Sequence, residues 1–181
     1  MKVTPLEIPD LKLIDLEVNE DSRGYFFELF HKTKFDTAIG ENITFVQDNI
    51  SKSSKGVLRG LHFQREPFTQ GKLISVLAGE VFDVVVDLRK NSKTYSKWLG
   101  INLNGEDKKQ LWVPPGFAHG FMTLSHEAFF YYKVTNFYSV NHEVTIDYAD
   151  DNLSIKWPEN VDMKISKKDQ SGISFNKFNA M

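Results

Sequence analysis

The sequence has no cysteine among its 181 residues. Disulfide bonds, zinc sites with cysteine ligands and thiol nucleophiles are therefore excluded. No apolar run approaches the roughly 20 residues that a membrane-spanning helix needs. The first ten residues carry Lys2, Pro5, Glu7 and Pro9 and lack the apolar segment of a signal peptide. We therefore expect a cytoplasmic protein.

The chain also lacks an excess of basic residues. It has 22 Lys and Arg against 24 Asp and Glu, a formal net charge of -2. A general grip on nucleic acid usually needs a clear basic excess, so that function class is not expected. A small anionic ligand remains possible, because a few local cations are enough to bind it. Hydrophobic residues make up 41% of the chain, which predicts one domain, residues 1–181, with a buried core.

Helix signals are scarce, and the pattern is mainly that of short strands. One short helix is predicted over Lys32–Gly40, with Gly40 as its C-cap. Residues 71–78 and 81–88 predict a hairpin that turns at Gly79-Glu80. Further strands are expected at 98–103, 110–113, 120–124, 128–134 and 144–148. Many short strands at close spacing favour a β-sandwich or barrel of the jelly-roll type. Residues 160–181 are more polar and predict a tail over the barrel, disordered at its very end.

The densest group of chemically useful side chains lies between Gln47 and Lys72. It contains Arg59, His62 and Lys72, which can bind anions or move protons near neutral pH. Each alone is better explained by an incidental surface charge or a buried structural histidine; three in one segment favour a site. Strict alternation places Arg59 and His62 on opposite faces of a strand. The strand must therefore kink or bulge at Gly60 if both line one cavity.

A second group is the run LWVPPGFAHGF, residues 111–121. Pro114, Gly116 and His119 form a rigid turn that directs an imidazole back into a barrel. Together with Gly56 and His62, this spacing looks like the two halves of the cupin signature. Metal cupins carry a second histidine where this chain has Gln64. Two imidazoles rarely hold a divalent metal firmly, so we expect no metal.

Several longer motifs carry a more specific resemblance. SKSSKGVLRGLHFQ, QGKLISVLAGEVFDVVVDLR, LWVPPGFAHGF, YYKVTNFY and ISKKDQ occur in this order, after an early DSRGYFFE. This set resembles the dTDP-4-dehydrorhamnose 3,5-epimerase family over about residues 21–169. The resemblance implies a cupin-type jelly roll and a proton-transfer reaction on a nucleotide-linked 4-keto-6-deoxy sugar. The pathway implied is dTDP-rhamnose biosynthesis, as used for lipopolysaccharide O-antigen.

The resemblance also implies roles for individual residues. His62 is expected to be the base, with Asp169 orienting its imidazole. Lys72 is expected to stabilise the enolate oxygen on C4, and Tyr132 to be the acid on the opposite face. The ketone itself takes up the electrons, so no cofactor is expected. His119 and Asp83 are expected to support the same cavity, with His119 counted among the substrate-binding residues.

The remaining substrate-binding residues concern the nucleotide. The resemblance assigns the pyrophosphate to Arg59, Gln47 and Asn49, which offer a cation and amides. It assigns the base to the aromatic ring of Tyr138, with Glu28 at the base edge. Arg23 and Phe26 match positions that reach in from a partner subunit. We therefore expect a homodimer in which the segment of about residues 1–30 contributes to the interface.

The chain departs from the family pattern at Asp147-Tyr148 and in the run QSGISFNKF after Asp169. These departures leave the choice of nucleotide and sugar open. Two rival functions stay open as well: an epimerase that inverts only C3 or C5, and a non-catalytic cupin that binds a sugar nucleotide. A metal-dependent cupin oxygenase or isomerase is disfavoured by Gln64.

Overall fold

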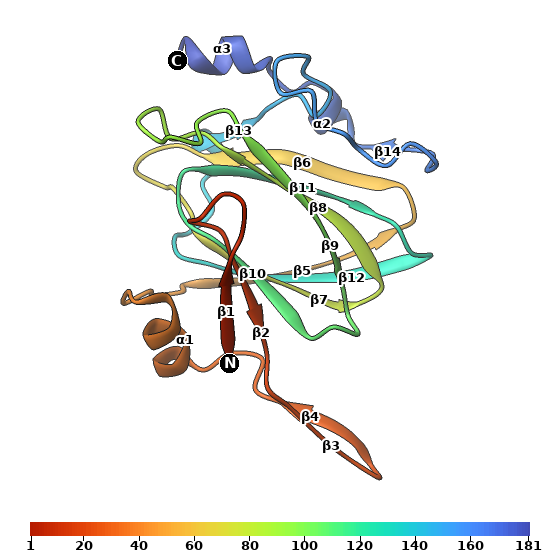
Figure 1. Ribbon diagram of the computed structural model, residues 1–181. Helices are drawn as coiled ribbons and strands as arrows, with labels where there is room; N and C mark the ends of the chain where they lie inside the picture. Colours follow the sequence, from red (N-terminus) through yellow and green to blue (C-terminus); the bar gives the residue numbers. More distant parts are fainter.

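Two antiparallel sheets face each other and enclose the core (Figure 1). The structure is a computed structural model that describes residues 1–181. The first sheet has the order β1 (Lys2–Pro5), β2 (Lys12–Asp15), β10 (Lys109–Val113), β7 (Lys72–Ala78), β12 (Glu127–Val134) and β5 (Gln47–Ser54). The second has the order β13 (Glu143–Thr145), β6 (Val57–Gln64), β11 (Phe117–Thr123), β8 (Glu80–Asp87) and β9 (Trp98–Asn104), with β14 (Lys164–Ile165) parallel to β6. This is the expected mainly β fold, a cupin-type jelly roll.

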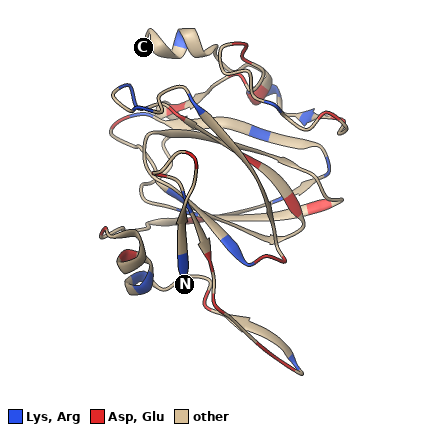
Figure 2. Ribbon diagram, viewed as in Figure 1, with Lys and Arg blue, Asp and Glu red and all other residues tan.

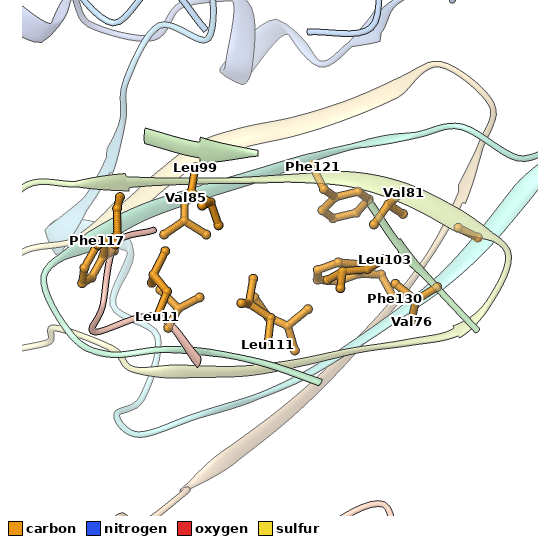
Figure 3. Close-up of a cluster of buried hydrophobic side chains, with 14 residues drawn as sticks. Leu11, Val76, Val81, Val85, Leu99, Leu103, Leu111, Phe117, Phe121 and Phe130 are labelled. Carbon is orange, nitrogen blue, oxygen red and sulfur yellow. The ribbon is translucent and has the colours of Figure 1, made fainter. Parts of the chain in front are cut away.

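Alternation along the strands explains the two-layer arrangement. Val81 and Val85 of β8 point into the core between the sheets, whereas Val84 and Val86 point to the outer face of the second sheet. Figure 3 shows the inner cluster, in which apolar side chains from both sheets interdigitate. Both faces of β8 are buried, which explains why apolar residues occur on both of them.

The hairpin predicted for residues 71–88 is wrong. Strands β7 and β8 form almost as predicted, but they belong to different sheets: β7 pairs with β10 and β12, and β8 with β9 and β11. The chain crosses between the sheets at Gly79, whose φ of 80° is in the left-handed region. A Cβ atom there would lie 2.1 Å from the carbonyl oxygen of Glu127. The Gly79-Glu80 turn therefore makes a barrel corner rather than a hairpin.

Other sequence predictions are confirmed with small changes in their bounds. Helix α1 (Lys32–Ile39) ends at Gly40, whose amide donates to the carbonyl of Asp36. Strand β11 begins at Phe117, three residues before the predicted start, and β13 ends at Thr145, three residues before the predicted end. Helix α1 covers the outer face of the first sheet, where Phe35 packs against Leu73 and Trp112.

The C-terminal segment covers the outer face of the second sheet. It contains α2 (Lys167–Gln170) and α3 (Phe175–Asn179), whereas the 3-10 helix η1 (Val140–His142) lies earlier, between β12 and β13. Phe175 and Phe178 are buried in the cluster that contains Val84 and Met122, so the expected disorder at the end of the chain is wrong. The two residues are three positions apart and so share the face of α3 that packs against the sheet. The departures from the family pattern lie in this cover: Tyr148 packs in the same cluster, and its carbonyl accepts from Trp157 Nε1 at 2.9 Å.

A two-stranded arm leaves the body of the barrel. Strands β3 (Val18–Asp21) and β4 (Gly24–Phe27) pair only with each other and extend away from both sheets (Figure 1). Tyr25 and Phe26 are 58% and 69% exposed on it. Charged residues of both signs are spread over the whole ribbon (Figure 2), so the charge at any site comes from a few local side chains.

Candidate active site

A cavity of about 330 Å³ opens between the two sheets. Its volume falls within the usual range for small-molecule sites. The first sheet contributes residues of β5, β7 and β12, and the second contributes residues of β6, β11 and β13. The lining residues are Asn49, Ile50, Ser51, Arg59, His62, Lys72, His119, Phe121, Phe130, Tyr132, Tyr138, Glu143 and Lys168. Seven of the twelve predicted site residues thus meet in one cavity.

An irregularity in β6 brings Arg59 and His62 to the same cavity. His119 of β11 lies opposite His62, and Phe121 lies opposite Arg59. Between these two pairs β6 therefore contains one more residue than β11, which is a β-bulge. Gly60 lies in this bulge with a φ of 132°, and a Cβ atom there would lie 2.5 Å from Gly120 Cα. The bulge reverses the alternation, as predicted from the spacing of Arg59 and His62.

The imidazole of His62 is hydrogen-bonded to the carboxylate of Asp169. His62 Nε2 lies 2.6 Å from Asp169 Oδ1, and the carboxylate is buried while the imidazole keeps 29% exposure. Burial raises the pKa of Asp169, but the hydrogen bond and charge of His62 outweigh it, and the pKa is lowered overall. An ionised carboxylate only accepts, so Nε2 of a neutral His62 carries the proton. Nδ1 is therefore the ring nitrogen left free to take a proton.

Helix α2 explains why a residue so far along the chain reaches His62. Ser166 caps the helix, because its Oγ accepts from the amide of Asp169 at 3.1 Å. The cap fixes the backbone at Asp169, whose carboxylate lies within hydrogen-bond distance of His62. Just before the helix, β14 pairs with the start of β6 and fixes the approach of the segment.

Tyr132 faces the cavity from the opposite sheet. It lies on β12 of the first sheet, whereas His62 lies on β6 of the second. Its neighbour Tyr131 points out of the barrel, where its hydroxyl lies 3.4 Å from Lys133 Nζ. Burial raises the pKa of Tyr132, and the charge of Arg59 offsets this only in part. The phenol therefore keeps its proton at neutral pH and is available as a donor.

Lys72 begins β7 and carries an ammonium group into the cavity. Burial lowers the pKa of Lys72 to about 8, while the charges of Asp83 and Glu143 act in the opposite direction. The ammonium form still dominates at neutral pH. No side chain of the protein is hydrogen-bonded to it, so its donors are free for an oxygen of a bound molecule.

A second pair of imidazole and carboxylate lies deeper in the barrel. His119 Nε2 is 2.8 Å from Asp83 Oδ2, and Asp83 is fully buried. Burial lowers the pKa of His119 against the opposing effect of Asp83. A neutral His119 that donates to Asp83 is consistent with the predicted supporting role.

The cavity mouth contains two residues that sequence reasoning missed, Glu143 and Lys168. Glu143 accepts from the hydroxyl of Tyr138 at 3.0 Å and from Lys168 Nζ at 2.7 Å. Both belong to segments that only long-range pairing brings to the mouth; Lys168 lies in the ISKKDQ motif, but only Asp169 of that motif was given a role. Gln47 does not line the cavity, but it donates to Asn49 Oδ1 at 2.8 Å and accepts from the amide of Tyr138 at 3.2 Å.

Three of the predicted residues lie away from the cavity of their own chain. Arg23 and Phe26 are on the arm, where Arg23 pairs with Asp21. Glu28 follows the arm and is ion-paired with Lys34 of α1. Within one chain these three side chains do not contribute to the site.

No group of three or more His, Asp or Glu side chains in the protein is arranged to hold a metal ion. His62 and His119 each engage a carboxylate of their own instead. No helix has the length and apolar character needed to cross a membrane.

Comparison with known proteins agrees with this geometry. The family model described as dTDP-4-dehydrorhamnose 3,5-epimerase matches residues 5–177. The chain belongs to this family. The dTDP-4-dehydrorhamnose 3,5-epimerase of Shigella flexneri is 51% identical over 175 residues, which cover 97% of this chain and 96% of that protein. The family resemblance found in the sequence motifs is thus confirmed.

Solved structures of family members have the same fold. A dTDP-6-deoxy-D-glucose-3,5-epimerase of Legionella pneumophila, in complex with dTDP-4-keto-L-rhamnose, has a TM-score of 0.95 and 46% identity, over 99% of this chain and 95% of that one. A 3'-monoepimerase of Streptomyces bikiniensis, in complex with dTDP-quinovose, has a TM-score of 0.92 and 27% identity, over 99% of this chain and 90% of that one. The fold therefore serves epimerases of one carbon and of two.

Proposed function

We propose that this protein inverts C3 and C5 of dTDP-4-keto-6-deoxyglucose and so forms dTDP-4-keto-rhamnose for dTDP-rhamnose-type biosynthesis. The observation that carries the proposal is the pairing of His62, held by Asp169, with Tyr132 across one cavity that also contains Lys72. The 51% identity to a 3,5-epimerase favours two inversions over one.

The first step is removal of a proton next to the ketone. A C–H bond beside a carbonyl is only weakly acidic, so the site must supply a base and stabilise the negative charge on oxygen. His62 Nδ1 takes the proton, and the C–H electrons move into the ring to make an enolate on O4. Asp169 keeps the imidazole oriented and stabilises its positive charge, as a carboxylate does for other catalytic histidines. Lys72 donates to the enolate oxygen.

The second step returns a proton from the other face. Tyr132 lies on the sheet opposite His62, so its hydroxyl can protonate the carbon on the side away from the base. The phenolate that results regains a proton from His62 or from water, which restores both groups. For the second carbon, the sugar must turn so that it lies between the same two side chains. The hydrogen bond from Lys72 to O4 stays in place while the sugar turns.

The nucleotide binds toward the mouth of the cavity. Arg59 and Asn49 provide donors for the pyrophosphate, and Tyr138 is half exposed and free to stack on the thymine. Arg23, Phe26 and Glu28 complete this end from the partner subunit of a homodimer. We also propose that the protein acts in the cytoplasm without a cofactor.

The deciding experiment is incubation with dTDP-4-keto-6-deoxyglucose in deuterated water, with NMR detection of label at C3 and C5. We expect label at both carbons, and the same rate in the presence of EDTA. Label at one carbon only would identify a single-site epimerase. Tight dTDP binding without any label would identify the non-catalytic alternative.

His62→Ala is the key variant in this experiment. Removal of a general base costs about 10²- to 10⁴-fold in rate, while dTDP binding should stay near its normal strength because the nucleotide contacts lie elsewhere. His126→Ala is the matched control, since His126 is exposed and does not line the cavity. Normal exchange in the His62 variant would assign the base to another group.

A further inference from the structure

The loop that carries Tyr138 has little packing to hold it in place. It connects β12 to β13, and its apolar residues Phe137 and Val140 are 60% and 70% exposed. Hydrophobic burial therefore contributes little to the position of the loop, and hydrogen bonds must fix it instead.

Two glutamines hold the centre of this loop. The amide of Tyr138 donates to Gln47 Oε1, and the amide of the next residue, Ser139, donates to Gln64 Oε1, each at 3.2 Å. Gln47 belongs to β5 of the first sheet and Gln64 to β6 of the second. The two neighbouring amides are thus tied to opposite sheets, one on each side of the cavity.

The segment that follows Gln64 fixes only the ends of the loop. The side chain of Asn136 donates to the carbonyl of Pro67, and Arg65 donates to the carbonyl of Asn141. From the second sheet, Gln64 is therefore the one side chain that reaches the backbone beside Tyr138. It is only 7% exposed, so water does not readily replace it as an acceptor.

We propose that Gln64 is a positioning residue for the nucleotide end of the substrate. It acts through the Ser139 amide to keep Tyr138 over the cavity mouth, and it has no part in proton transfer. The proposal rests on the proposed function, in which Tyr138 stacks on the base. It also gives a role to the position at which this chain has a glutamine where metal cupins have their second histidine.

The test is Gln64→Leu, which keeps the bulk of the side chain and removes the acceptor. Loss of one hydrogen bond, which leaves the donor without an acceptor, corresponds to about a tenfold change in an equilibrium constant. We expect the Kd for dTDP, measured by calorimetry, and the KM to rise about tenfold. The kcat for deuterium exchange at saturating substrate should change by less than about twofold.

Gln110→Leu is the matched control. Gln110 is a buried glutamine as well, but it binds Leu29 and Ser75 on the outer side of the first sheet. It should leave the Kd for dTDP unchanged. If Gln64→Leu does not fold, Gln64→Asn, which keeps the amide but shortens its reach, gives the same comparison.

The outcomes separate the two proposals. A normal dTDP affinity in the Gln64 variant, with weakened binding in Tyr138→Ala, would overturn the role of Gln64 and leave the epimerase function in place. An equal fall in kcat and kcat/KM would also overturn it. Wild-type protein that neither binds dTDP nor exchanges protons would refute the epimerase function itself.

Discussion

Neighbouring residues with the same chemistry have different roles in this site because strand geometry separates them. Tyr131 and Tyr132 are adjacent in sequence, yet one faces the outside and the other the cavity. Asp83 and Asp87 share one face of β8, but Asp83 holds His119, whereas Asp87 binds Arg89, Ser92 and Thr94 beyond the cavity. Position along the strand, not residue type, decides which group can act on a ligand.

Tyr132→Phe should separate proton removal from inversion. The variant keeps His62 and Lys72, so it should still exchange protons for deuterium on the original face. It should give mainly uninverted or singly inverted sugar, because the donor on the opposite face is missing. An NMR time course in deuterated water measures both events. Tyr131→Phe is the matched control and should behave like the wild type. Doubly inverted product at full rate from Tyr132→Phe would make another residue or a water the acid.

The pH dependence of kcat should report the charge of Lys72. Its pKa of about 8 lies below the ordinary value of 10.5, so the ammonium form is present at neutral pH and is lost as pH rises through 8. Because the charged form stabilises the enolate, kcat should fall on the alkaline side with a midpoint near pH 8. Lys72→Arg should move this limb to higher pH, since guanidinium stays charged. A limb that does not move in this variant would assign the titration to another group.

Most of the site could be predicted from sequence, but two residues of its mouth could not. His62, Lys72 and Arg59 lie within one short segment, and the need for a bulge at Gly60 follows from simple alternation. Asp169 was placed only by resemblance, since a carboxylate in a lysine-rich tail has no local sign of a buried partner. Glu143 and Lys168 were missed because their approach to Tyr138 depends on how β13 and α2 pack against β6.

At the scale of elements, strands were easier to predict than their partners. The alternation that marks β7 and β8 is local, so their bounds were nearly correct. A glycine turn between two strands is compatible with a hairpin and with a barrel corner alike. The choice between them depends on β10 and β12, which lie far along the chain. They pair with the two edges of β7 and leave no edge for β8.

The C-terminal cover is the element on which the His62–Asp169 pair most depends. Asp150 ties its parts together, because one carboxylate oxygen accepts from the amides of Asn152 and Leu153 and the other from Phe175. Ile173 forms a parallel bridge with Ile146, whose backbone pairs with Leu61 of β6, so the segment that follows Asp169 returns to the second sheet. Packing of the cover thus fixes a residue of the active site.

Phe175→Ala tests how firmly the cover is held. Phe175 is 4% exposed, and truncation of a buried phenylalanine typically costs about 3–5 kcal/mol of unfolding free energy. Phe137→Ala serves as control, because Phe137 is exposed and its loss should change stability by less than about 0.5 kcal/mol. Urea unfolding followed by fluorescence measures both. Equal stability of the two variants would mean that α3 adds little to the cover.

At the scale of the whole molecule, the exposed arm is the feature that one chain leaves unexplained. Aromatic side chains with more than half of their surface exposed, on strands without further partners, are typical of an interface. The proposed homodimer places Arg23 and Phe26 of each arm at the nucleotide end of the other subunit's cavity. An isologous two-fold pair satisfies both sites at once.

Mixed dimers can test this exchange directly. We expect His62→Ala and the double variant Arg23→Ala, Phe26→Ala each to be weakly active alone. Co-expressed, they should regain about a quarter of wild-type activity, because half of the dimers are mixed and each mixed dimer has one intact site. His62→Ala with Tyr132→Phe is the control and should regain nothing, since both residues belong to one chain's cavity. A protein that is active and is a monomer by light scattering would contradict the proposed homodimer.

The separation of His62 from Asp169 has a consequence for synthesis of the protein. The two residues are 107 positions apart. At ribosomal rates of about 5–20 residues per second, some 5–20 s pass between the appearance of the imidazole and that of its carboxylate. Every strand, from β1 to β14, has been made before the dyad exists. Proton-exchange activity therefore reports a chain in which the segment around Asp169 has been made and has closed over the second sheet.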